Sequence, residues 1–303
     1  TLTGDIEHLT LWRIVQALGG AAGMVIPRAV VRDNLETRDA SKALSLLLLI
    51  MGVTPILGPI LGAQVLLFAG WRGIFVIMTV VGAALTYFTA RNMRETLAPE
   101  KVVPLRAGIM ARNYWGLLRS RQFIFYALAG GMGSAGLFTF ISGASRILIN
   151  VYDIPPTYFG FVFGLGAASL ITSSQVSARL LDRHSPERLL QLAQVSAVVA
   201  TVVAVCLILV DALTLPLLML CLMGFMGSQG FVNPNAAALA LSRQGHRLGV
   251  ASALMGTVQM ICGASAGIGI SLWQSDTAMP LVGILAGCAV LSWLFGALAR
   301  RAA

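Results

Sequence analysis

The chain alternates between long apolar segments and short polar ones. Many of the apolar runs reach 18 residues or more, which is long enough for a helix to cross a bilayer. We therefore predict an all-α, multi-pass membrane protein. The predicted transmembrane helices cover residues 9–31, 43–69, 73–90, 123–146, 158–180, 189–210, 213–241, 249–273 and 278–299.

Basic residues in the short polar segments predict an orientation. Alternate segments, such as 32–42, 91–122 and 179–188, are rich in arginine, whereas the other set holds only Arg72 and Arg146. Because Lys and Arg in short loops favour the cytoplasm, the first set is predicted to lie inside. The C-terminus is then cytoplasmic and the first residue external, a parity that nine helices satisfy.

The composition agrees with a membrane class. Hydrophobic residues make up 57% of the chain and charged residues 11%, against about 25% charged in soluble domains. The net charge of +9 does not indicate nucleic-acid binding, because the basic residues are spread over short loops and form no single patch. The four cysteines lie inside apolar runs without a C-x-x-C pair and are interpreted as small hydrophobic residues that face lipid or a neighbouring helix. We predict the lipid bilayer as a partner, and neither a metal nor a cofactor.

The longest polar segment, 91–122, divides the chain unequally. Three predicted helices precede it and six follow it. Three further helices at the front would give two six-helix halves, the arrangement of many transporters. The chain also lacks an initiator Met. We therefore expect an N-terminally incomplete chain: residues 1–90 are the rest of an N-terminal bundle, 91–122 a central cytoplasmic loop and 123–303 a C-terminal six-helix bundle.

The first predicted helix carries a charged residue inside an apolar run. Arg13 lies near its start, Gln16 follows one turn later on nearly the same face, and Gly19 and Gly20 lack side chains that would keep a neighbour away. An ionisable residue within a membrane helix is costly and is a functional candidate. The alternative is that the long Arg13 side chain reaches the membrane interface.

The second predicted helix contains the string PILGPILGA. Pro55 and Pro59 are one turn apart, and Gly58 and Gly62 form G-x-x-x-G. Proline kinks a helix and glycine allows a neighbouring helix to approach closely. From these properties alone, a generic kinked packing helix is an equally open interpretation.

Both motifs resemble those of the major facilitator superfamily. R-x-x-Q-x-x-G-G over 13–20 is similar to the fourth-helix motif of its drug–proton antiporters, and Gly58-Pro59-x-x-Gly62 to the fifth-helix antiporter motif. Further strings resemble the Bcr/CflA group of bacterial multidrug exporters. They are VRD (31–33), GWRGIF (70–75), RETLAPE (94–100), GLFTFISGAS (136–145), PPTYFGFVFGL (155–165), SPERLL (185–190), NPNAAALAL (233–241) and GVASALMGTVQ (249–259).

The resemblance implies a major facilitator fold, with about nine of its twelve helices in this chain, and export of hydrophobic compounds in exchange for protons. In related antiporters an arginine like Arg13 is thought to communicate with a proton-binding carboxylate on the first helix. A nearby guanidinium favours the deprotonated form of such an acid. Every acidic residue in this chain lies in a loop or at a helix end, so we expect that carboxylate on an absent helix.

Two charged pairs resemble gating motifs of the family. Arg32 and Asp33 close the first predicted helix, and Asp182 and Arg183 match the second-half copy of the cytoplasmic loop motif. Anchoring charges and a solvated loop are the alternative interpretations of these pairs.

The substrate site is expected to be apolar and aromatic with a few hydrogen-bonding groups. Amides within a membrane segment should face the protein interior, whereas each phenylalanine could equally pack against a neighbouring helix. The candidates are Phe138, Phe140, Ser142, Phe161, Phe163, Gln229, Asn233, Asn235 and Gln259.

Other function classes lack their motifs. The sequence has no H-E-x-x-H and no paired aspartates within the membrane, so we do not predict an enzyme. A metabolite exporter for sugars or amino acids, on the same fold, and a truncated non-transporting protein remain as alternatives. The resemblance implies a monomer in a bacterial inner membrane, with small hydrophobic compounds and protons as its ligands.

Overall fold

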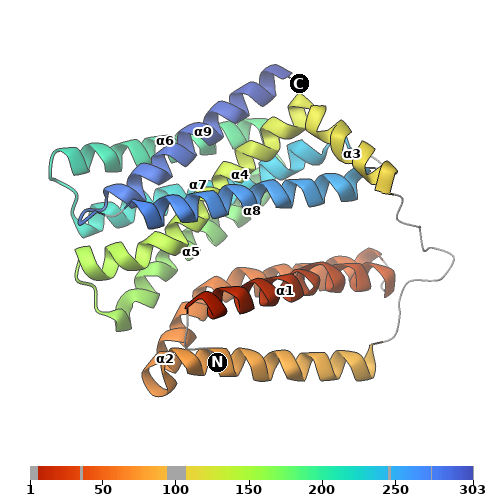
Figure 1. Cartoon of the computed structure of the whole chain (residues 1–303). Coiled ribbons are helices and arrows are strands. Elements are labelled where there is room, and N and C mark those ends of the chain that lie inside the picture. Colours follow the sequence, from red (N-terminus) through yellow and green to blue (C-terminus); the bar gives the residue numbers. More distant parts are fainter. Residues whose placement is uncertain (1–5, 35–36, 94–106, 245–246, 274, 303) are drawn as a thin grey trace. The chain divides into compact units, whose positions relative to one another are not determined.

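The computed structural model describes residues 6–34, 37–93, 107–244, 247–273 and 275–302 (Figure 1). Side chains in parts of the first two ranges, and those of Ala107, Ile109, Met110, Pro156, Thr157 and Leu248, are not described. The elements are α1 (Ile6–Asn34), α2 (Thr37–Asn92), α3 (Ala107–Arg119), α4 (Arg121–Arg146), the π-helical turn η2 (Ile147–Val151), α5 (Pro156–Leu180), α6 (Pro186–Leu209), α7 (Leu215–Leu241), α8 (Leu248–Leu272) and α9 (Met279–Ala302). These ranges contain no strand, which confirms the predicted all-α class.

The helices follow the predicted ranges closely, with one addition. The predicted helices 43–69 and 73–90 both lie in α2, which is interrupted at Gly70, where φ is 62° and ψ −177°. Such a positive φ favours glycine, which has no Cβ to clash. The segment predicted as the central loop, 91–122, contains the helix α3. Its sequence places apolar residues such as Leu117 on one side, and Leu117 is buried.

The chain divides into two compact units, which we describe separately. Unit 1 is Thr1–Pro104 and unit 2 is Leu105–Ala303, so the boundary falls inside the predicted central loop. In unit 1 none of the described side chains is buried, and large apolar ones such as Leu18 and Phe68 are mostly exposed. A surface of this kind suits hydrocarbon rather than water.

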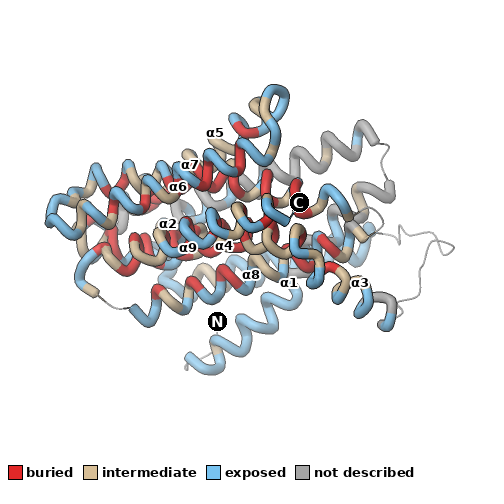
Figure 2. Tube along the Cα trace, turned by 90° about the horizontal axis from the view of Figure 1, so that it is seen from above, coloured by how far each residue is buried: buried red, intermediate tan, exposed pale blue. Residues whose placement is uncertain are grey.

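Unit 2 has a buried core centred on α4 and α7. The helix α4 packs against α7, α8 and α9, and α7 packs also against α5 and α6. Figure 2 shows the buried residues along these helices. Glycine makes the close approaches possible. A Cβ at Gly136 of α4 would meet the ring of Phe225, and a Cβ at Gly143 would come within 3.0–3.2 Å of Ile270 and Leu281.

Seven helices in the described residues are long and apolar enough to cross a membrane. They run from Leu61 to Asn92, Arg121 to Val151, Tyr158 to Leu180, Pro186 to Leu209, Leu215 to Leu241, Gly249 to Leu272 and Met279 to Ala302. They confirm a multi-pass membrane protein. The crossing of the predicted helix 9–31, and of most of 43–69, stays a prediction.

Candidate functional site

Arg13 and Gln16 form a hydrogen-bonded pair on α1. The Arg13 Nη1 donates to Gln16 Oε1 at 2.8 Å, as a spacing of three residues along a helix allows. The Arg13 guanidinium carbon also lies 5.6 Å from the ring centroid of Phe75, on the part of α2 that follows Gly70. That distance permits a cation–π interaction. The guanidinium is therefore oriented by one contact from its own helix and one from α2.

A cavity of about 370 Å³ surrounds this pair within unit 1. Cavities that bind small organic molecules typically measure about 300–1,000 Å³, with apolar walls and few polar groups. Arg13 supplies the charge here, and Gln16 and Thr79 supply the other polar side chains. The lining residues are Leu9, Trp12, Arg13, Gln16, Phe75, Met78, Thr79 and Gly82.

The cavity includes residues that the sequence predictions missed. Phe75 ends the GWRGIF string, whose resemblance indicates the family and not a cavity, and Trp12 precedes Arg13. The position of Trp12 next to Arg13 could have indicated its role. No local pattern indicates Phe75, because its approach to Arg13 depends on the packing of α1 against α2.

The predicted packing glycines of unit 1 remain untested. A Cβ at Gly19, Gly20, Gly58 or Gly62 would have no described atom within 4 Å. Their role in helix packing stays a prediction. The side chains of Arg32, Asp33, Pro55 and Pro59 lie outside the described residues.

Three predicted amides of unit 2 lie along the glycine face of α4. A Cβ at Gly133 would lie 2.6 Å from Gln229 Oε1 and 3.1 Å from Asn233 Oδ1, and a Cβ at Gly130 would lie 3.7 Å from Gln259 Nε2. The Gln229 and Asn233 oxygens are buried without a hydrogen-bond partner among the described residues. A buried acceptor without a donor costs about 1–3 kcal/mol. These two oxygens therefore keep the capacity to accept from water or from a ligand.

Asn235 lies on another face of α7 and joins it to α5. Its side chain is buried, and Nδ2 donates to Ser177 Oγ at 2.9 Å and to the Phe231 carbonyl at 2.8 Å. The donor capacity of this amide is used within the helix bundle, whereas its buried Oδ1 has no hydrogen-bond partner among the described residues. The two donated bonds support a packing role for Asn235, and its contact with substrate stays a prediction.

We expect the Asn235–Ser177 hydrogen bond to stabilise unit 2. Asn235→Leu and Ser177→Ala should each lower the free energy of unfolding by about 0.5–1.5 kcal/mol. The double variant should lose less stability than the sum of the two single losses, because both substitutions remove the same hydrogen bond. Unfolding in detergent of all four proteins measures this, and strictly additive losses would contradict the coupling.

The two phenylalanines of the fourth predicted helix contact different neighbours. The Phe140 side chain is 1% exposed, and its ring stacks on Phe163 with centroids 4.8 Å apart. The Phe138 ring lies where a Cβ on Gly263 of α8 would be, with its nearest ring carbon 2.5 Å from that position. For Phe140 and Phe163 the structure supports core packing, the alternative left open by the sequence. Phe161 is exposed.

Asp182 and Arg183 lie in the connection between α5 and α6, and both are exposed. Neither forms an ion pair with a residue that the structure describes. Their gating role therefore remains a prediction from the loop motif.

The sequence matches the family model described as Major Facilitator Superfamily over residues 2–268. It is 32% identical to "Uncharacterized MFS-type transporter YdgK" of Bacillus subtilis, over 97% of this chain and 73% of that protein. It is 29% identical to "Bicyclomycin resistance protein homolog" of Haemophilus influenzae, over 97% and 74%. It is 28% identical to "Multidrug resistance protein MdtL" of Klebsiella pneumoniae, over 94% and 71%.

Solved structures show the same fold at low identity. A bacterial homologue of the human lysosomal transporter Spinster matches with a TM-score of 0.68 and 14% identity, over 99% of this chain and 78% of that one. A bacterial homologue of the iron transporter ferroportin matches with a TM-score of 0.61 and 16% identity, over 90% and 66%. At this identity the likeness concerns the fold alone.

Proposed function

The chain belongs to the Major Facilitator Superfamily, and on that premise we propose that it exports small hydrophobic, drug-like compounds in exchange for protons. The observation that carries the proposal is the cavity around Arg13 and Gln16. Its size suits a drug-sized molecule, and its walls combine aromatic and aliphatic side chains with one guanidinium and one amide. Relatives named for bicyclomycin resistance and multidrug resistance support the same substrate class.

The lining of the cavity favours neutral compounds with hydrogen-bond acceptors. Arg13 can donate to a carbonyl or hydroxyl oxygen, and Gln16 can both donate and accept. Trp12 and Phe75 offer flat apolar surfaces to an aromatic or aliphatic portion of the compound. A sugar would need many more paired donors and acceptors than this lining contains, which places the metabolite exporter second.

Proton coupling in this proposal depends on Arg13. No acidic side chain is among the described residues that line the cavity. The proposal therefore requires a carboxylate from elsewhere in the protein to bind the proton near the guanidinium. When that acid is charged it pairs with Arg13, and when it is protonated it leaves Arg13 free for the substrate. Alternating access would couple the two states.

The remaining predictions belong to the same proposal. We place the protein in the bacterial inner membrane as a monomer, with its C-terminus in the cytoplasm, as the arginine distribution favours. Arg32 with Asp33, and Asp182 with Arg183, would control the cytoplasmic side. Gln229, Asn233 and Gln259 remain proposed substrate-binding residues of unit 2.

Transport by the full 303-residue chain can be tested in everted membrane vesicles. Energised vesicles should accumulate a hydrophobic fluorescent drug, and a protonophore should abolish that accumulation. Bicyclomycin and unrelated hydrophobic drugs should compete, whereas sugars and amino acids should not. Competition by metabolites alone would favour the metabolite exporter. Accumulation equal to that of vesicles without the protein would reject drug export for this chain.

A further inference from the structure

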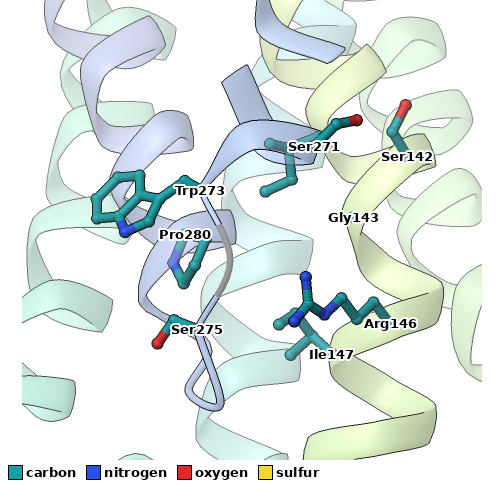
Figure 3. Close-up of a pocket in the computed structure, with 9 residues that line it drawn as sticks. Ser142, Gly143, Arg146, Ile147, Ser271, Trp273, Ser275 and Pro280 are labelled. Carbon is teal, nitrogen blue, oxygen red and sulfur yellow. The ribbon is translucent and has the colours of Figure 1, made fainter. Parts of the chain in front are cut away.

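A second, smaller cavity lies in unit 2, where α4 and α8 end and α9 begins. It measures about 150 Å³ and is lined by Ser142, Gly143, Arg146, Ile147, Ile270, Ser271, Trp273, Ser275 and Pro280. In Figure 3 the Arg146 side chain extends from α4 across this space toward Ser275 and Pro280. Of the polar residues that line this cavity, only Ser142 is among the substrate-site candidates predicted from the sequence.

The Arg146 guanidinium has no carboxylate partner among the described residues. Asp153, Asp211 and Asp276 are the described acids in the connections at this end of unit 2, and none of them is within ion-pairing distance of Arg146. Arginine is also rare on this predicted side of the membrane, since only Arg72 and Arg146 lie there. The Arg72 guanidinium stacks on Trp71 at 4.3 Å, whereas Arg146 faces an open cavity.

The lining combines one cation with hydroxyls and includes no acidic group. Ser142 forms no hydrogen bond with a described residue, so its hydroxyl proton is available to a ligand. Ser271 donates to the Gly267 carbonyl at 2.9 Å, and Ser275 lies 3.0 Å from the Thr277 hydroxyl. The Ser271 proton is used within α8, and the bond between Ser275 and Thr277 can run in either direction, so Arg146 and Ser142 are the principal donors.

We propose that this cavity binds a phosphate group through Arg146 and Ser142. A guanidinium matches the oxygens of a phosphate with two parallel N–H groups. The volume suits a compact oxyanion and is too small for a drug-sized molecule. The absence of acids from the described lining disfavours a cation.

The phosphate has two possible sources. The cavity lies at the ends of transmembrane helices, the depth of lipid headgroups, and Trp273 beside it is a residue type enriched at that interface. A membrane phospholipid would present its phosphate at this depth. Inorganic phosphate from the aqueous phase offers the same oxygens. Either source would offer phosphate oxygens to Arg146 and Ser142, and the binding experiment below distinguishes the phospholipid from the free ion.

The test uses the full chain, purified and stripped of lipid. Native mass spectrometry measures binding of phosphatidylglycerol and of diacylglycerol with identical chains, and thermal shift measures the response to inorganic phosphate. Arg146→Gln should weaken the phosphate-dependent signal about tenfold or more, as expected for a lost charge-assisted hydrogen bond. Arg146→Lys should retain part of it, and Ser142→Ala should weaken it less.

The matched control is Arg72→Gln, which removes an exposed arginine from the same predicted side but from outside this cavity. It should bind phosphate like the unaltered chain. A signal from phosphatidylglycerol alone identifies the lipid, and one from inorganic phosphate alone identifies the free ion. If the Arg146→Gln variant binds both phosphatidylglycerol and inorganic phosphate as well as the Arg72→Gln variant does, the proposal is overturned. Drug transport is not needed for this readout, so the result stands apart from the proposed export function.

Discussion

Replacing Arg13 with alanine should reduce drug transport by about 10- to 100-fold. The guanidinium donates to Gln16 Oε1 at 2.8 Å, lies over the Phe75 ring and provides the charge in the described cavity lining. Hydrogen bonds that involve a charged group contribute about 1.5–3 kcal/mol, and each 1.4 kcal/mol corresponds to about tenfold in affinity. The initial rate of drug uptake by energised vesicles, divided by the amount of protein in the membrane, measures the effect.

Three further variants make the Arg13 result specific. Arg13→Lys keeps the charge but loses the planar fork, so its transport should fall between that of the unaltered chain and Arg13→Ala. Gln16→Ala removes the partner and should cause a smaller loss than Arg13→Ala. Arg72→Ala removes another arginine of unit 1, outside the cavity, and should leave transport unchanged. If Arg13→Ala transports normally at equal membrane levels, Arg13 is an interface anchor and the proposed site is wrong.

The sequence predicted the helices well because each one is specified by its own apolar run. The break predicted near residues 70–72 lies at Gly70, whose non-helical φ and ψ separate the two predicted helices within α2. The helix α3 lies outside the predicted helices because these rest on membrane-length apolar runs, and its 13 residues are too few to cross a bilayer.

Contacts within one helix were predictable, whereas contacts between helices were not. The Arg13–Gln16 bond follows from a spacing of three residues, but the approach of Phe75 depends on how α1 and α2 pack. Residues two apart on a helix point about 200° apart. Asn233 and Asn235 therefore cannot share a face, and the structure directs them to α4 and α5 respectively. This periodicity was available from the sequence and could have separated the two asparagines.

The same periodicity separates Phe138 from Phe140. One contacts Gly263 of α8, and the other contacts Gly166 and Phe163 of α5. An unbroken apolar helix gives no polar face from which to choose between these directions. Which side chain is buried then depends on which helix packs against each face, and this packing cannot be predicted from the sequence of one helix.

Gly230→Ala should cause a large loss of stability in unit 2. A Cβ at this position would lie 2.5 Å from the Leu170 carbonyl oxygen and 2.7 Å from the Ser174 nitrogen, and would also meet Ser173 Oγ. The first two are backbone atoms of α5, so no side-chain rotation can relieve the clash. The helices α5 and α7 must separate, and overpacking of this kind typically costs about 1–3 kcal/mol. Unfolding in detergent measures the change.

Gly287→Ala is the matched control, because it makes the same substitution in a membrane helix where no described atom lies within 4 Å of the new Cβ. Alanine is the better helix former by about 1 kcal/mol, so this variant should be as stable as the unaltered chain or more stable. Gly230→Ala should therefore lower the stability of unit 2 and Gly287→Ala should not, because only the Cβ at residue 230 would lie close to a neighbouring backbone. Equal stability of the two variants would show that α5 and α7 are not in close contact at Gly230. The Asn235–Ser177 hydrogen bond, which joins the same two helices, would then be in doubt as well.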